Sequence, residues 1–283
     1  MKKTLLFALI LLFFASCGWF NQPPEIATVL TEHFKNKLYK KFDTVAYDSV
    51  FIKILAENKG DLIHPKVTTA FYQSVNHQPV LVTKFYTTGA LDTLTNLILS
   101  SKADGLNPEF FELSAIAKLK STLDANRFKT IEEVYPVIAA LEIKAANAFL
   151  KYQQVMQFGC VNPRNVFNRY YIVVKRPDSV SLDSLLRTDD LISVLHQAQP
   201  KNAAYLNLKR ALAFYRDSLK NDNNEAIKKI KINLERLRWQ IPLQSEEQVL
   251  VNIPDFSLTW LKKEDTLAHM NVCVGAKREN GYA

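Results

Sequence analysis

The side chains of this sequence that could act as nucleophiles or metal ligands are three cysteines and five histidines. A cysteine nucleophile needs an electropositive setting and a base close to its sulfur. Cys160 follows the expected C-terminus of a helix, where partial negative charge raises the pKa of a thiol, and no histidine occurs between His77 and His196. We therefore predict that Cys160 is a small buried residue at a helix exit, and that the chain contains no catalytic residue.

The other candidates also favour structural roles. Cys273 alternates with two valines, as a strand residue would, and the pair Cys160 and Cys273 allows one disulfide but no disulfide framework. Asp104 stands before Gly105, and this dipeptide is typical of a turn. The histidines are His33, His64, His77, His196 and His269. Because no two of them have metal-ligand spacing, we predict no metal site and no cofactor.

The third cysteine, Cys17, stands at a different kind of site. Two lysines precede the apolar run LLFALILLFF, and Ala15 and Ser16 stand directly before the cysteine. These are the features of a secretion signal, and a run of about ten residues is too short to span a bilayer core about 30 Å thick. The segment resembles the lipobox of bacterial lipoproteins, with Phe14 in place of the commoner leucine.

The lipobox resemblance implies that residues 1–16 are a signal peptide and that Cys17 takes a diacylglycerol. We therefore expect a protein of the bacterial cell envelope, lipid-anchored to a membrane and facing the periplasm. Residues 17–25 include two prolines and are expected to form an extended tether. The alternative is an ordinary signal peptide followed by a chance cysteine.

The charge of the chain narrows the class of partner. Removal of residues 1–16 takes away Lys2 and Lys3 and lowers the formal charge from +8 to +6. A mildly basic surface suits anionic lipid headgroups or cell-wall polymer. The export signal, and the lack of basic clusters with interleaved aromatics, argue against nucleic acid. The longest basic stretch, around Lys228 and Lys229, fits the solvated face of a helix.

Apolar spacing predicts a mainly α chain. The low glycine content, 7 of 283 residues, also favours helices over tight-turned sheets. The best-defined helix covers residues 130–158, with a capping box of Thr130 and Glu133 at its start and Gly159 as its stop. Leu91, Leu94, Leu97 and Ile98 form an apolar stripe at helical spacing. Further helices are expected at residues 26–42, 49–57, 189–198, 203–219 and 225–239.

Short strands are expected in two places. Residues 80–86 have the branched and aromatic content of a strand or an extended segment. After Pro242 the pattern changes, and residues 248–253, 257–261 and 271–274 alternate as strands. Three strands fold only when they pack on something else, so we interpret residues 242–283 as the start of an incomplete β-rich domain.

Three stretches in this order resemble the large L,D-transpeptidases of the bacterial cell wall. They are ADGLNPEFF at residues 103–111, LEIKAANAFLKYQQVMQFGCVNP at residues 141–163, and NLERLRW at residues 233–239 followed by VNIPDF. The resemblance implies a helical scaffold domain, here residues 26–241, that carries a β-rich catalytic domain. It also implies peptidoglycan stem peptides as partners and a cysteine acyl-enzyme in cross-link formation.

The sequence departs from the family at two points. Many members carry a peptidoglycan-binding module between scaffold and catalytic domain, for which this chain has no room. The family nucleophile lies in a Ser-His-Gly-Cys-like motif, and no His-Gly-Cys occurs in this sequence. We therefore expect the scaffold portion of a cross-linking enzyme, inactive by itself because it lacks the nucleophile. The alternative is a non-catalytic envelope lipoprotein that binds peptidoglycan or a protein partner.

Overall fold

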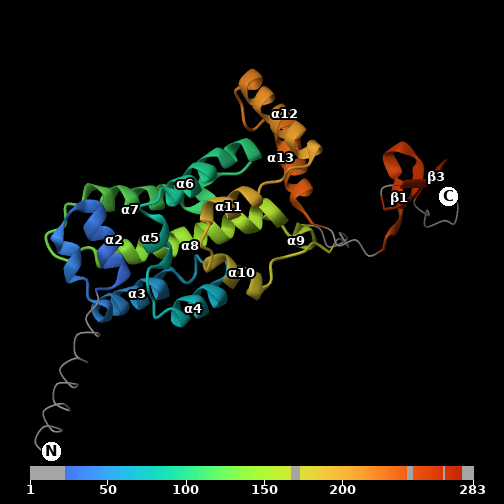
Figure 1. Cartoon of the computed structure of the whole chain (residues 1–283). Helices are drawn as coiled ribbons and strands as arrows, with labels where there is room; N and C mark the ends of the chain where they lie inside the picture. Colours follow the sequence, from blue (N-terminus) through green and yellow to red (C-terminus); the bar gives the residue numbers. More distant parts are fainter. Residues whose placement is uncertain (1–22, 167–172, 241–244, 264, 276–283) are drawn as a thin grey trace, which may run out of the picture.

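The computed structural model describes residues 23–166, 173–240, 245–263 and 265–275. Helices make up most of this part of the chain, and a small antiparallel sheet follows them (Figure 1). The prediction of a mainly α chain that ends in short strands is confirmed. The predicted signal peptide and lipidation site at Cys17 lie outside the described residues.

Helices are labelled α and 3-10 helices η. In the first half of the chain they are α2 (Glu25–Phe34), η1 (Lys37–Lys41), α3 (Thr44–Asn58), α4 (Pro65–Ser74), α5 (Val80–Phe85), α6 (Ala90–Ser100), η2 (Ser101–Asp104), η3 (Pro108–Phe111) and α7 (Leu113–Ala125). In the second half they are α8 (Tyr135–Phe158), α9 (Pro163–Val166), α10 (Ser179–Leu186), α11 (Leu191–Gln197), α12 (Ala203–Leu219) and α13 (Glu225–Arg238).

α8 is the central post of the bundle, and α3, α5 and α7 pack around it (Figure 1). It is apolar on nearly all sides, which is the pattern of a helix buried all round. The helix starts at Tyr135 and not at residue 130. Pro136 occupies its first turn, where a missing N–H has no helical partner to lose, and the Glu133 carboxylate accepts the Lys129 N–H at 2.8 Å.

The predicted strand at residues 80–86 is wrong, because this segment forms helix α5. The carboxylate of Glu142, which is fully buried in α8, accepts the backbone N–H groups of Leu81 at 2.9 Å and Val82 at 2.8 Å. Free N–H groups at a helix start need such acceptors. A long-range cap therefore overrides the strand propensity of the branched and aromatic residues.

Most of the other predicted helices are present. α2, α3, α11, α12 and α13 lie within a few residues of their expected positions, and Leu91, Leu94 and Ile98 of the α6 stripe are buried. Residues 26–42 divide into α2 and η1, because Lys35 ends α2 in the left-handed region with φ 50°. Helices α4 and α10 were not predicted. α4 begins at a proline, which is favoured in a first helical turn.

The sheet is a meander of β1 (Glu247–Asn252), β2 (Ser257–Lys262) and β3 (Asp265–Asn271). β1 and β2 match the predicted strands, but the third strand lies earlier than residues 271–274. Cys273 therefore follows β3, and its prediction as a strand residue is wrong.

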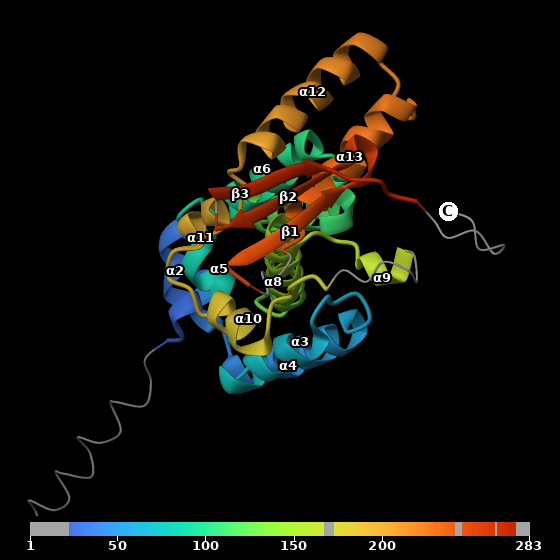
Figure 2. The same ribbon diagram turned by 90° about the vertical axis from the view of Figure 1, so that its right-hand side faces the viewer.

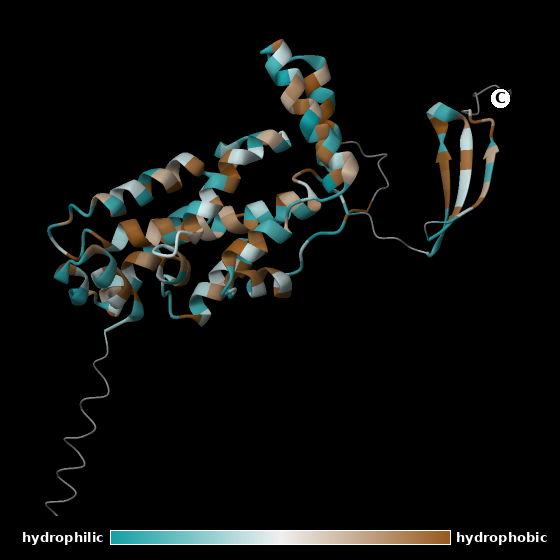
Figure 3. Ribbon diagram, turned by 45° about the horizontal axis from the view of Figure 1, so that its top comes forward, coloured by the Kyte–Doolittle hydropathy of each residue, from teal (hydrophilic) through white to brown (hydrophobic). Residues whose placement is uncertain are grey.

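One face of this sheet is apolar. The register places Val249 beside Trp260 and Trp260 beside Ala268, and it places Val251 beside Leu258, which in turn pairs with Met270. Apolar residues recur along the strands in Figure 3, and Val249 is 61% exposed. Within the described residues, this face is largely uncovered.

Among the described residues, no helix is both long enough and apolar enough to cross a membrane.

Candidate functional site at the base of the α12–α13 hairpin

The three sequence motifs meet at one place in the structure. Asp104 and Gly105 follow α6, Gly159 and Cys160 follow α8, and the NLERLRW part of the third motif forms the C-terminal end of α13. These ends lie together where the hairpin of α12 and α13 joins the bundle (Figure 1). We call this place the hairpin base.

Glu235 is the hub of the hairpin base. One carboxylate oxygen accepts the backbone N–H of Val161 at 2.8 Å and the indole N–H of Trp239 at 3.0 Å. The other oxygen accepts from Arg238 at 2.9 Å and from the Cys160 thiol at 3.3 Å. Burial by itself raises the pKa of Glu235, but these donors and the Arg238 charge hold it below its usual value.

Arg238 extends this network into the hairpin and the α6 end. Its buried guanidinium donates to the Asp104 carbonyl at 3.1 Å and to the Tyr205 hydroxyl at 2.9 Å. The Tyr205 hydroxyl donates to the Asp104 carboxylate at 2.9 Å, and Lys209 pairs with that carboxylate at 2.8 Å. Asp104 was predicted as a turn residue. Gly105 does complete that turn with φ 78°, but the Asp104 side chain also holds α12.

The backbone at the C-terminal end of α8 packs in close contact with α13. Gly159 has φ 76°, and a Cβ atom at this position would lie 2.5 Å from the Glu235 carboxylate and 2.7 Å from the Trp239 ring. Glycine tolerates both the conformation and the close approach. Arg176 fixes the same exit from the other side, because it donates to the carbonyls of Phe158, Gly159 and Val161. The hairpin base is therefore a rigid junction.

Beside the network lies an apolar hollow of about 440 Å³. Its apolar lining comes from the loop after η2, from the α8 exit with α9, and from α13. The lining side chains are Leu106, Val161, Pro163, Val166, Ile232 and Trp239. The hollow thus borders the last turn of α13, the last helix before the sheet in the described chain.

Cys160 is exposed and not buried as predicted. Partial burial of its thiol and the neighbouring Glu235 carboxylate raise its pKa to about 11. A thiol with this pKa is almost entirely protonated at neutral pH. Cys160 and Cys273 are both free thiols, and no disulfide joins them. The described residues contain no cluster of three metal-ligating side chains.

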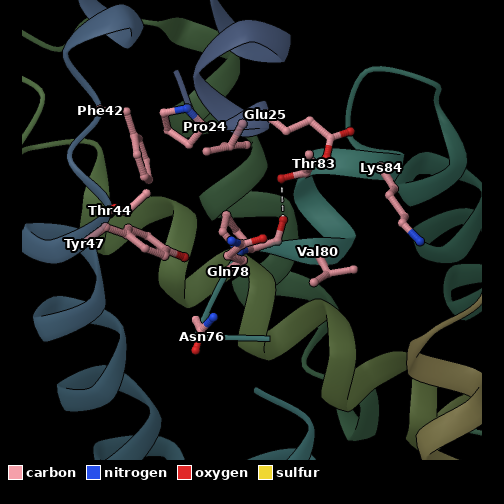
Figure 4. Close-up of a pocket in the computed structure, with 12 residues that line it drawn as sticks. Pro24, Glu25, Phe42, Thr44, Tyr47, Asn76, Gln78, Val80, Thr83 and Lys84 are labelled. Carbon is pink, nitrogen blue, oxygen red and sulfur yellow. Dashed lines mark hydrogen bonds between the residues drawn. The ribbon is translucent and has the colours of Figure 1, made fainter. Parts of the chain in front are cut away.

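A second hollow, of about 200 Å³, lies between the N-terminal ends of α2 and α3 and the segment that carries α5 (Figure 4). Phe42 and Tyr47 line one side, and Val80, Thr83 and Lys84 line the other. The lining also contains Glu25, but the Lys84 amine pairs with Asp189 at 2.5 Å, outside the hollow. We therefore place the candidate functional site at the hairpin base.

Sequence reasoning missed three members of the hairpin base, Tyr205, Arg176 and the hub Glu235. One signal was available for Glu235. It follows the buried Leu234, and Arg238 lies one turn later, so two charged residues stand on the buried side of α13. Charged residues at buried positions usually form pairs.

Comparison with known protein families gives a match over the middle of the chain. A family model described as "Scaffold domain" matches residues 66–212, which is just over half of the chain. No curated protein and no solved structure matches. The match spans α4 to most of α12 and includes two of the three motifs that meet at the hairpin base. The chain therefore belongs to the Scaffold domain family, the scaffold of L,D-transpeptidases.

Proposed function

We propose that this chain is the scaffold portion of a cell-wall L,D-transpeptidase that cross-links peptidoglycan stem peptides through a cysteine acyl-enzyme. The observation that carries the proposal is the hairpin base, where Glu235 and Arg238 lock α13 to the exit of α8. α13 is the last helix before the sheet in the described chain. A rigid α13 gives the β-rich part a defined departure point from the bundle.

In the proposed reaction, a cysteine thiolate attacks the carbonyl before the terminal D-alanine of a stem peptide. D-alanine leaves, and the amine of a neighbouring diaminopimelate then resolves the acyl-enzyme. The scaffold contributes by holding the part of the enzyme that carries the reacting groups in a fixed position. Accurate position is important, because misplacement of reacting groups by about 1 Å costs about a hundredfold in rate. The high pKa of Cys160 argues against a role as this thiolate.

Export and lipidation at Cys17 are part of this proposal. α2 begins at Glu25, eight residues after Cys17, so the tether is short. Intact mass of the mature N-terminus tests this part directly. A mature chain that starts at Cys17 and carries a diacylglycerol supports it, and an unmodified Cys17 contradicts it.

The function is tested by muropeptide analysis of cells that lack the gene. We expect fewer cross-links between two diaminopimelates, and recovery when the gene is restored. A gene that encodes Arg238→Met should restore little, because the buried Glu235 carboxylate loses its cation. Arg127→Met, an exposed change in the loop after α7, serves as the matched control and should restore fully.

Unchanged cross-links in the deletion strain would reject the enzyme proposal. They would favour the second candidate, a non-catalytic envelope lipoprotein that binds peptidoglycan or a protein partner. The apolar sheet face, on which Val249 and Trp260 are both exposed, is the observation that favours a protein partner.

A further inference from the structure

The basic charge of the chain is concentrated in one projecting element. Residues 203–238 contain nine lysines and arginines and four aspartates and glutamates, a net charge of +5, whereas all 283 residues together carry +8. This segment is the hairpin of α12 and α13, which stands out from the bundle in both Figure 1 and Figure 2. Tyr205, Leu212, Ile227 and Leu234 give the hairpin a small core of its own.

Three of the hairpin acids are occupied by partners from within the hairpin. Arg216 and Lys231 both bind Asp222, at 2.7 Å and 2.8 Å, and lower its pKa to about 2. Lys228 pairs with Glu225 at 2.9 Å, and Glu235 is enclosed in the hairpin base. Asp217 remains as an exposed acid.

Several cations of the hairpin stay available to a partner. Arg210, Lys220 and Lys229 are exposed, and none of them forms an ion pair within the described ranges. Lys220 lies at the tip, where it ends α12 in the left-handed region with φ 47°. The three charges are therefore spread from α12 over the tip to α13.

Aromatic rings lie next to these charges. Phe214 is 67% exposed, which is high for a phenylalanine, and Tyr215 beside it is also exposed. Arg210 and Phe214 are four residues apart in α12, so they lie on one face of the helix. An exposed ring beside a cation offers stacking for a sugar face and a charge for a carboxylate.

We propose that the outer surface of the hairpin binds peptidoglycan strands. Arg210, Lys220 and Lys229 would meet the carboxylates of the stem peptides, and Phe214 would stack on a sugar ring. This inference rests on the proposed cell-wall function. In Figures 1 and 2 the tip of the hairpin projects from the bundle and stands clear of α2, the helix that follows the tether. The hairpin tip thus stands apart from the proposed anchored end, which favours wall polymer over membrane lipid.

The inference is tested by sedimentation of the mature chain with purified sacculi. The triple variant Arg210→Gln, Lys220→Gln and Lys229→Gln should bind about tenfold more weakly, with a smaller dependence on salt. The matched control is Lys37→Gln, Lys40→Gln and Lys53→Gln, which removes the same charge from exposed lysines outside the hairpin. The control should lose less than about twofold if binding is local to the hairpin.

Phe214→Ala separates stacking from charge. Because the ring is exposed, we expect the variant to fold normally, to bind sacculi about fivefold more weakly, and to keep the salt dependence of the parent. Circular dichroism of all variants checks the fold.

Three outcomes would overturn the inference: no sedimentation of the parent with sacculi, equal losses in the two triple variants, or hairpin-dependent binding to phosphatidylglycerol vesicles without binding to sacculi. The transpeptidase proposal fails separately, on unchanged cross-links in the deletion strain. Sacculus binding with unchanged cross-links would keep the hairpin inference and assign it to a non-catalytic wall-binding lipoprotein.

Discussion

At the scale of single residues, buried carboxylates hold this molecule in register. Glu235 accepts hydrogen bonds from the loop after α8, from Arg238 and from Trp239. Glu142 accepts hydrogen bonds from the backbone N–H groups at the start of α5 and from the Tyr72 hydroxyl at 2.8 Å. Each carboxylate joins segments that are far apart in the sequence. Neither environment follows from local sequence, because periodicity shows that a position is buried but not which donors surround it.

The thiol of Cys160 should react slowly for its exposure. Its pKa of about 11, against an ordinary value of 9.0, implies a thiolate fraction about a hundredfold smaller at pH 8. We expect iodoacetamide to modify Cys273, which is also exposed, well before Cys160, as measured by peptide mapping. Glu235→Gln should speed the reaction at Cys160. Faster modification of Cys160 than of Cys273 in the parent chain would contradict this account.

Glu142 should make stability depend on pH. Burial raises its pKa from 4.5 to about 7, so the folded state binds this proton more tightly than the unfolded state does. The free energy of unfolding should therefore fall as pH rises from about 4.5 to 7, by at most about 3 kcal/mol. Urea unfolding at several pH values measures this slope.

Glu142→Gln should flatten the slope, because the amide does not titrate and its oxygen still accepts N–H groups. Glu57→Gln, an exposed change in α3, is the control and should leave the slope as it is. A parent chain that becomes more stable between pH 4.5 and 7 would show that Glu142 does not dominate this range.

At the scale of helices and strands, the sequence predicted what depends on local pattern. Local patterns predicted the α6 stripe, the end of α8 at Gly159 and the strands β1 and β2, because apolar periodicity and stop signals are local. The helical conformation of α5 could not be predicted from its own sequence, since it depends on Glu142, about 60 residues further on. The meeting of three motifs at the hairpin base required the fold itself.

The fit between α8 and α13 predicts a large cost for Gly159→Ala. The new methyl group would meet Glu235 and Trp239 in addition to the strain of φ 76°, and we expect a loss of about 3 kcal/mol in unfolding free energy. Gly89→Ala is a matched control, because Gly89 has φ 79° with open space around it, and it should cost about 1 kcal/mol. Equal losses at the two sites would mean that the close approach is not important.

At the scale of the whole molecule, a continuous helical core contrasts with a thin sheet. The main core runs from Ile26 to Ala198, whereas β1 to β3 bury few side chains. Such a meander is marginal without a covering layer. The domain boundaries predicted near residues 25 and 241 remain predictions, although the change from helices to strands falls between α13 and β1.

Limited proteolysis should therefore cleave the sheet before the helical bundle. We expect trypsin to cut at Lys262 and Lys263, in and just after β2, long before Lys144, which is tied to Glu112 at 2.6 Å in the bundle. Mass spectrometry of the time course should show a persistent helical fragment. Simultaneous loss of both parts would indicate that the sheet is protected by contacts on its apolar face.

The length of α8 has a mechanical consequence. One end of this helix holds the beginning of the chain, where the Tyr135 hydroxyl accepts the Asp43 N–H at 2.9 Å, and the other end holds Trp239. Its 24 residues make a strut of about 36 Å between the two. Under the proposed lipid anchor at Cys17, the length of this strut would set the distance from the anchored end at which the chain meets the wall. Each helical turn added to α8 would lengthen the strut by about 5.4 Å. The hairpin would keep nearly the same orientation around the helix axis.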